Sequence, residues 1–317
     1  MRGGRHVAAV TDASFDLPAG ECLALVGESG CGKSVLASAL LGLLPGNAQT
    51  AGRALLGDTE LLTADEKTLA RTVRGRRIGL VPQSPAAHLT PVRTVGAQLG
   101  ETLRELTGTR KPDVPRAVRA AAERAAFPAD HLDRYPHELS GGLAQRAATA
   151  LALVGDAPLL LADEPTTGLD RDLVNRTVDE LRRHVDAPLR SASALSTDSG
   201  GRAGRALLMI THDLAAAERI ADRIAVMYAG RIVELADAKA FFGRPGPRHP
   251  YARGLLNALP ERDFTPIPGM PPELGELPAG CAFAARCPHA AEACAVRPRF
   301  ADGIACHHPS AEEPARA

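Results

Sequence analysis

A glycine-rich segment between two apolar stretches constrains the fold of this chain most strongly. The apolar run 22–26 before it is typical of a buried parallel strand, and the apolar positions of residues 35–43 after it recur with helical period. The segment fits G-x-x-x-x-G-K-[ST], in which backbone N–H groups, a lysine and a hydroxyl hold the phosphates and Mg²⁺ of a nucleoside triphosphate. A chance glycine turn before a helix is the alternative, which this context disfavours. The predicted nucleotide-binding residues are Gly27, Glu28, Ser29, Gly30, Cys31, Gly32, Lys33 and Ser34.

Further apolar runs predict the rest of an α/β sheet. Three of them, at 159–162, 207–210 and 224–228, have the length and composition of buried strands, and helical periodicity occupies 172–184 and 214–221. Strands that alternate with helices imply a mostly parallel sheet. The dipeptide Ala229-Gly230 resembles a hairpin turn between the last run and residues 232–234.

Between the first two strands, residues 94–153 show helical spacing and no convincing strand, so we expect a helical subdomain over about 85–155. Residues 186–205, rich in Ser, Gly, Ala and Arg, are typical of a flexible surface loop. Prolines multiply after Gly243 and break any long helix. We therefore predict two domains, 1–236 and a small loop-rich module over 237–317.

The charge balance excludes one large class of partners. Lys plus Arg total 37 and Asp plus Glu total 37, so no basic surplus is available for general binding to DNA or RNA. No window approaches the roughly 20 apolar residues of a membrane span, and the first ten residues do not resemble a signal peptide. We expect a soluble chain that is not exported.

Two acids follow the strand predicted at 159–162. Asp163 would lie at the carboxyl edge of the sheet, where Mg²⁺ would sit, and Glu164 is next in line to polarise a water molecule. Two exposed acids opening a turn before Pro165 are the alternative. The pair favours hydrolysis in addition to binding.

A second anion site is predicted at residues 140–142. Ser140 and the two glycines after it precede a helical stretch, so their N–H groups would lie at a helix N-terminus. The glycine-rich loop, this Leu-Ser-Gly-Gly, the acid pair, the run 166–170 and Thr211-His212-Asp213 occur in an order that resembles the nucleotide-binding subunits of ABC transporters. The resemblance implies a P-loop NTPase cassette with a helical subdomain.

The resemblance also implies roles for individual residues. Glu164 would act as general base, and His212 would hold the γ-phosphate. Gln83 would sense Mg²⁺ and face the membrane subunit, and Asp170 would lie at the interface between cassettes. The γ-phosphate would be contacted from a second cassette, identical or paralogous, by Ser140, Gly141 and Gly142. The implied ligands of Mg²⁺ are Ser34, Gln83 and Asp163.

Beyond the cassette, His249-Pro250-Tyr251, residues 267–272, Cys281 and Arg286-Cys287-Pro288 resemble the C-terminal extension of oligopeptide and dipeptide importer ATPases. This implies a motor subunit on the cytoplasmic face of the membrane, with two permease subunits and an extracellular substrate-binding protein, that imports peptides. A nickel or metal-chelate importer is the runner-up. A soluble ABC-type ATPase that acts on nucleic acid or ribosomes should show a coiled-coil insertion, a second cassette or a basic stripe, and none appears.

The N-terminus departs from the family pattern. An aromatic residue upstream of the phosphate loop stacks on adenine in the family, whereas residues 1–10 offer only the imidazole of His6. Either His6 serves weakly or the start of the chain is assigned too late, and we expect the second.

Four cysteines crowd near the C-terminal end: Cys281, Cys287, Cys294 and Cys306. Disulfides are disfavoured in a reducing compartment, and the absence of C-x-x-C pairs weakens the case for zinc. Unligated thiols and a cluster of iron and sulfur remain. The resemblance to peptide-importer ATPases favours a structural [4Fe–4S] cluster, and intact Lys33, Glu164 and His212 disfavour a degraded ATPase that only binds metal.

Overall fold

The computed structural model describes residues 7–189 and 204–309, and their contacts divide them into two compact units. The first unit contains the described residues of Met1–Asp16, Leu23–Leu36 and Thr211–Ala317. The second contains Leu17–Cys22 and the described part of Ala37–Ile210. The glycine-rich loop therefore shares a unit with the C-terminal residues. The domain boundary near residue 236 stays a prediction.

Strands of the first unit hold the glycine-rich loop. Strand β1 (Cys22–Val26) pairs in parallel with β7 (Arg223–Tyr228), which pairs antiparallel with β8 (Arg231–Asp237). Every residue of β1 is buried, which explains why its sequence is a continuous apolar run instead of an alternating one. The hairpin turn between β7 and β8 is confirmed, and both of its residues, Ala229 and Gly230, have positive φ, as a type I′ turn requires.

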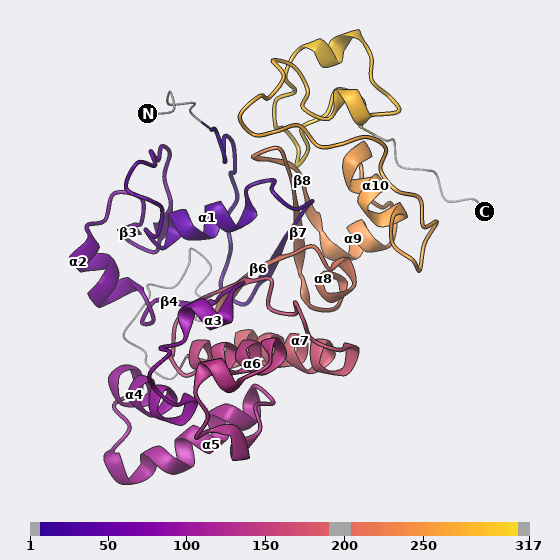
Figure 1. The fold of residues 1–317 in the computed structure, drawn as a ribbon. Helices are drawn as coiled ribbons and strands as arrows, with labels where there is room; N and C mark the ends of the chain where they lie inside the picture. The colour runs from indigo at the N-terminus through magenta and orange to yellow at the C-terminus, as the bar shows by residue number, and fades with distance from the viewer. Residues whose placement is uncertain (1–6, 190–203, 310–317) are drawn as a thin grey trace. The chain divides into compact units, whose positions relative to one another are not determined.

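The C-terminal residues pack on these strands. Helix α9 (Ala238–Phe242) contacts β7, β8 and α8 (Leu214–Ile220). Helix α10 (Pro250–Asn257) shares a hydrophobic core with them, and the segment drawn in yellow follows it (Figure 1). In that segment the only described helices are two short 3₁₀ turns, η5 (Ala284–Arg286) and η6 (Glu292–Ala295). One hydrophobic core nevertheless joins β1, β7, α9 and α10 to Phe283, directly before η5: its members include Ala24, Val26, Ile224, Val226, Tyr228, Phe241, Tyr251 and Phe283.

A buried histidine begins α10. The Nδ1 atom of His249 accepts a hydrogen bond from the N–H of Tyr251 at 3.0 Å, which caps the helix. The backbone N–H of His249 in turn donates to the carboxyl group of Glu234 at 2.8 Å. Burial lowers the pKa of His249 to about 4, although a hydrogen bond with the backbone of Ala305 acts in the opposite direction. Burial also raises the pKa of Glu234.

These shifts predict that stability depends on pH. Between pH 6.5 and about 4 the unfolded chain binds a proton on His249 that the folded chain does not, so this histidine makes the fold less stable as the pH falls through that window. We expect the difference in unfolding free energy between wild type and His249→Asn to be smaller at pH 5 than at pH 7.5 by about 2 kcal/mol.

Urea unfolding at the two pH values measures this difference. Asn keeps a helix-capping acceptor but cannot titrate, and Glu234 is present in both proteins, so the comparison isolates the imidazole. An equal difference at both pH values would show that His249 does not titrate as described.

The second unit has its own parallel strands. Strands β4 (Ile78–Val81), β5 (Leu159–Asp163) and β6 (Ala206–Thr211) pair in this order. Strand β4, which has four residues and contains Gly79, was not predicted from the sequence. A Cβ atom on that glycine would lie 3.1 Å from the carbonyl oxygen of Ala152, so close packing explains the weak strand pattern.

The chain between β1 and β4 is less regular. Helix α1 (Lys33–Leu40) follows the glycine-rich loop and ends before the predicted residue 43. A two-stranded hairpin of β2 (Leu55–Leu56) and β3 (Thr59–Glu60) comes next, and α2 (Glu66–Thr68) and the π-helical turn η1 (Leu69–Val73) lead into β4.

Helices α3 (Pro85–His88), α4 (Val95–Thr107), α5 (Val114–Arg124) and α6 (Gly141–Ala152) follow β4. Helices α4, α5 and α6 share a hydrophobic core with the connecting segments and contact one another (Figure 1). The predicted helical part of the cassette is therefore present between β4 and β5.

Helix α7 (Arg171–Asp186) leads into the predicted flexible loop, most of which lies outside the described residues. Arg205, the last residue of the predicted surface loop, is instead buried and donates hydrogen bonds to the carbonyl oxygens of His184, Ala187 and Pro188 at 2.7 to 3.3 Å. Its guanidinium also contacts Asp156. These bonds satisfy carbonyl groups at the C-terminus of α7 and fix both ends of the loop. His6 also lies outside the described residues.

Candidate functional site

Two glycines place the glycine-rich loop of residues 27–34, here called the phosphate loop, against β7 and the N-terminal segment. A Cβ atom on Gly27 would lie 2.2 Å from the carbonyl oxygen of Met227, and one on Gly32 would lie 2.3 Å from the carbonyl oxygen of Ala9. Only glycine allows these approaches. The loop then enters α1 at Lys33, so its last N–H groups lie at a helix N-terminus, where anions are stabilised.

Lys33 is buried within the loop. Its ammonium group donates to the carbonyl oxygens of Gly27 at 2.8 Å and Glu28 at 3.0 Å and lies 3.8 Å from the sulfur of Cys31. Burial raises the pKa of the Cys31 thiol. The cation is therefore held inside the curve of the loop, where a phosphate group would be bound.

The C-terminal residues contact the loop directly, which sequence analysis did not anticipate. Arg286 makes two hydrogen bonds with the carboxylate of Glu28, at 2.7 and 2.9 Å, and the hydroxyl group of Tyr251 accepts from the N–H of Glu28 at 2.9 Å. Both residues fall in motifs that identified the C-terminal extension, but no spacing rule connects them to a loop more than two hundred residues away. Only the fold reveals this contact.

His212 belongs to the same unit as the phosphate loop. It follows β6 directly and is exposed, and the next residue, Asp213, caps α8 by accepting a hydrogen bond from the N–H of Ala216 at 3.0 Å. The hydroxyl group of Thr211 accepts from the N–H of Asp213 at 3.0 Å, which fixes the turn that presents the imidazole.

The acid pair and Gln83 belong to the second unit. Strands β4 and β5 are parallel, with Val81 opposite Ala162, so Gln83 and the acids lie at the same carboxyl edge. Asp163 and Glu164 are both buried. Glu164 has a φ of 50°, in the left-handed region, and its N–H donates to the carbonyl oxygen of Ile210 at 2.8 Å. Such a backbone costs about 1 to 3 kcal/mol and is found preferentially at functional sites.

Residues 140–142 form the predicted helix start in this unit. Ser140 is the N-cap of α6 and accepts from the N–H of Leu143 at 3.3 Å. Ser140 and Gly141 are exposed, and a Cβ atom on Gly141 would meet nothing within 4 Å. Asp170 caps α7 in the same manner, through the N–H of Leu173 at 3.0 Å. The amide groups at the start of α6 are thus presented on a surface.

The structure therefore distributes the predicted site residues over two units. The phosphate loop and His212 belong to one, whereas Gln83, Asp163, Glu164 and the start of α6 belong to the other. Their assembly into one catalytic site stays a prediction.

The prediction of a [4Fe–4S] cluster is wrong. Among the described residues no group of three or more His, Cys, Asp or Glu side chains is arranged to hold a metal ion, and the four C-terminal cysteines, all of them described, are free. Burial raises the pKa of the thiols of Cys281, Cys287 and Cys306. Cys281 and Cys287 instead pack against the hydrophobic core that contains Phe283.

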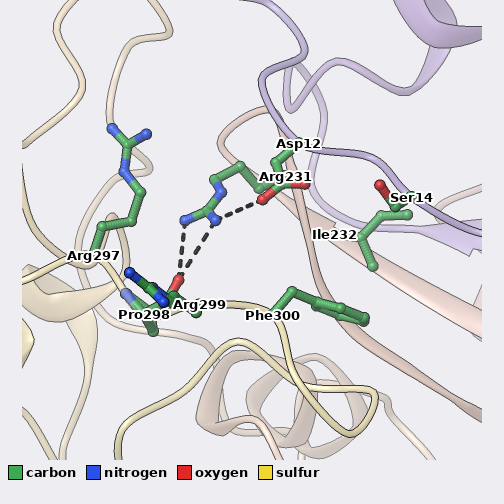
Figure 2. A pocket seen from close by; sticks show the side chains of 8 residues that line it. All are labelled: Asp12, Ser14, Arg231, Ile232, Arg297, Pro298, Arg299 and Phe300. Atoms are coloured by element: carbon green, nitrogen blue, oxygen red, sulfur yellow. Dashed lines mark hydrogen bonds and ion pairs between the residues drawn. The ribbon is translucent and has the colours of Figure 1, made fainter. Parts of the chain in front are cut away.

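A pocket of about 310 Å³ lies elsewhere in the first unit (Figure 2). Arg231 points across it toward Asp12, with a bond of 2.8 Å, and toward the carbonyl oxygen of Pro298 at 3.5 Å (Figure 2). These contacts connect the N-terminal segment, β8 and the C-terminal segment. Arg231 therefore has a structural role in the first unit. None of the site residues lines the pocket.

Comparison with protein families identifies the chain. A family model described as "ABC transporter" matches residues 10–167, and one described as "Oligopeptide/dipeptide transporter, C-terminal region" matches residues 233–294. The dipeptide transport ATP-binding protein DppD of Bacillus subtilis is 39% identical over 303 residues, which cover 92% of this chain and 84% of DppD. The chain belongs to the ABC transporter ATP-binding family. It is an ABC-type ATPase.

Further matches agree with this assignment. The oligopeptide transport ATP-binding protein OppD of Salmonella typhimurium is 40% identical over 298 residues, 91% of this chain and 83% of OppD. The ATP-binding cassette MJ0796, solved as a dimer in a post-hydrolysis state with ADP and phosphate, is similar with a TM-score of 0.61 and 22% identity over 73% of this chain and 90% of that one. This similarity confirms the α/β cassette fold. In the part of the chain that the structure describes, no helix is both long and apolar enough to cross a membrane.

Proposed function

We propose that this ABC ATPase is the motor subunit of a peptide importer and works on the cytoplasmic face of the membrane. The observation that carries the proposal is the similarity to peptide-transport ATP-binding proteins over about nine tenths of the chain, including the C-terminal region. Two permease subunits and an extracellular substrate-binding protein would complete the importer. A nickel or metal-chelate cargo has no such support among these relatives.

We propose that the site residues act as the family pattern implies. The phosphate loop binds the nucleotide, and Lys33 places its charge beside the phosphates. The oxygen atoms of Ser34, Gln83 and Asp163 suit Mg²⁺, which prefers such ligands, and buried Asp163 gives the site its negative charge. The ion would neutralise charge on the phosphates. Glu164 accepts a proton from the attacking water, and His212 holds the γ-phosphate.

We also propose that hydrolysis requires a second cassette, identical or paralogous. Ser140 and Gly141 at the start of α6 are exposed, and nothing lies within 4 Å of a Cβ atom placed on Gly141. Their amide groups are therefore available to a ligand that another subunit holds. ATP would then stabilise a closed pair of cassettes in which Ser140, Gly141 and Gly142 face the γ-phosphate of the partner. Hydrolysis would remove that bridge, and the attached permeases would change conformation with it.

The cargo is tested in cells. Cells that lack this chain should lose uptake of radiolabelled di- and oligopeptides and recover it with the wild-type gene but not with Glu164→Gln. Uptake of radiolabelled nickel should be unaffected. Loss of nickel uptake with intact peptide uptake would contradict the peptide assignment.

The general base is tested by Glu164→Gln. The amide has a similar shape but cannot accept the proton of the attacking water, so we expect ATP binding to be retained and turnover to fall at least about 100-fold. Single-turnover hydrolysis and nucleotide titration measure the two effects. ATP should also shift the variant toward a dimer in size-exclusion chromatography. Wild-type turnover would show that another group is the base.

The second cassette is tested by Gly141→Asp. A carboxylate in the first turn of α6 interacts favourably with the helix dipole and has open space, so the melting temperature should not fall. The same charge would repel a partner's γ-phosphate, so ATP-dependent dimerisation and steady-state hydrolysis should be lost while the isolated chain still binds ATP. Hydrolysis at the wild-type rate would exclude this role of α6.

A further inference from the structure

One peptide plane of the phosphate loop is held from two sides. The carbonyl oxygen of Gly27 accepts a hydrogen bond from the ammonium group of Lys33 at 2.8 Å, and the N–H of Glu28, in the same peptide unit, donates to the hydroxyl group of Tyr251 at 2.9 Å. A peptide unit is planar, so the bond to Tyr251 fixes the direction of the carbonyl group. The direction of that carbonyl group in turn fixes where the ammonium group lies.

The side chain of Glu28 is held as firmly as its backbone. Arg286 binds both carboxylate oxygens in the bidentate geometry, and its side chain is only 4% exposed. Its remaining nitrogen donates to the carbonyl oxygen of Pro268 at 2.9 Å, and a further contact at 3.3 Å reaches the hydroxyl group of Tyr228. Hydrogen bonds between two charged groups are roughly twice as strong as those between neutral groups, and the bidentate geometry restricts both side chains more tightly.

An aromatic cluster fixes the two residues that hold the loop. The ring of Tyr251 lies 4.4 Å from that of Tyr228 and 5.4 Å from that of Phe283, and Tyr251 and Tyr228 are almost fully buried. The guanidinium of Arg286 lies 5.8 Å and 5.9 Å from the ring centres of Tyr228 and Phe283. These distances allow cation–π attraction. Helix α10, strand β7 and turn η5 thus form one rigid support.

We propose that the C-terminal segment is part of the nucleotide site, in which Tyr251 and Arg286 are positioning residues that hold the Gly27–Glu28 peptide, and through it Lys33, in the conformation that binds ATP. The inference rests on the proposed nucleotide role of the loop. Both residues act on the loop and not on the nucleotide itself. Their contribution is preorganisation: a loop that is already ordered loses less conformational entropy when the nucleotide binds.

A role in folding alone makes a different prediction. Loss of packing would lower the melting temperature without changing the nucleotide affinity of the folded molecules. Loss of loop order would weaken binding even where the melting temperature is unchanged. Tyr251→Phe separates the two because it keeps the buried ring and removes only the hydroxyl group that bonds Glu28.

The experiment titrates purified full-length chain with a fluorescent ATP analogue and Mg²⁺ and records melting curves of the same samples. We expect Kd to rise about fivefold in Tyr251→Phe and about tenfold in Arg286→Gln. Arg286→Lys should recover part of the loss. Arg262→Gln is the matched control: this arginine donates to the carbonyl oxygen of Phe242 at 2.9 Å in the same C-terminal segment and touches no loop residue, so its Kd should equal that of wild type.

A double variant tests the pair directly. If Arg286 acts through Glu28, then Glu28→Gln combined with Arg286→Gln should raise Kd by less than the product of the two single effects. Wild-type Kd in folded Tyr251→Phe, or an equal rise in Arg262→Gln, would overturn the inference, and should Arg286→Gln not fold, Tyr251→Phe alone decides. Failure of the wild-type chain to bind the analogue would instead overturn the nucleotide role of the loop, and the inference with it.

Discussion

The close approach of Gly27 to the carbonyl oxygen of Met227 determines where the phosphate loop leaves its strand. Val26 of β1 lies opposite Val226 of β7, and the loop begins one residue later, at a point that no side chain could occupy. Because β7 pairs with β8 and packs against the C-terminal residues, the path of the loop depends on these contacts as well. The position of the phosphate loop is thus determined by the backbone contact between Gly27 and Met227 as well as by the sequence of the loop.

The C-terminal segment owes its fold to this same core. It has little regular structure, and its described helices after α10 are single turns, yet Phe283 is buried among Tyr228 and Tyr251. An aromatic side chain buries roughly 150 to 250 Å² of surface, which is a large contribution for so short a segment. A metal centre is therefore not needed to explain how a proline-rich segment remains folded, and the cysteine spacing alone could not indicate this core.

Strong local patterns made most of the fold predictable. The apolar runs at β1, β5, β6 and β7, the Ala229-Gly230 turn and the helix start at Ser140 each have a local cause in the sequence. Strand β4 was missed because Gly79 serves a distant contact with Ala152. The bond between Tyr251 and Glu28 could not be predicted either, since nothing near either residue in the sequence encodes it.

One hydrophobic core continues across the domain boundary predicted near residue 236. The sequence changes character after Gly243, where the prolines begin to accumulate, but the hydrophobic core continues across this point. Tyr228 precedes that point and Phe283 follows it, and their rings are in edge-to-face contact at 5.3 Å. Residues that share one core lose their packing together, so β7, α10 and η5 should unfold as one cooperative unit. The residues that hold the phosphate loop from the C-terminal side are consequently as stable as the strand that carries it.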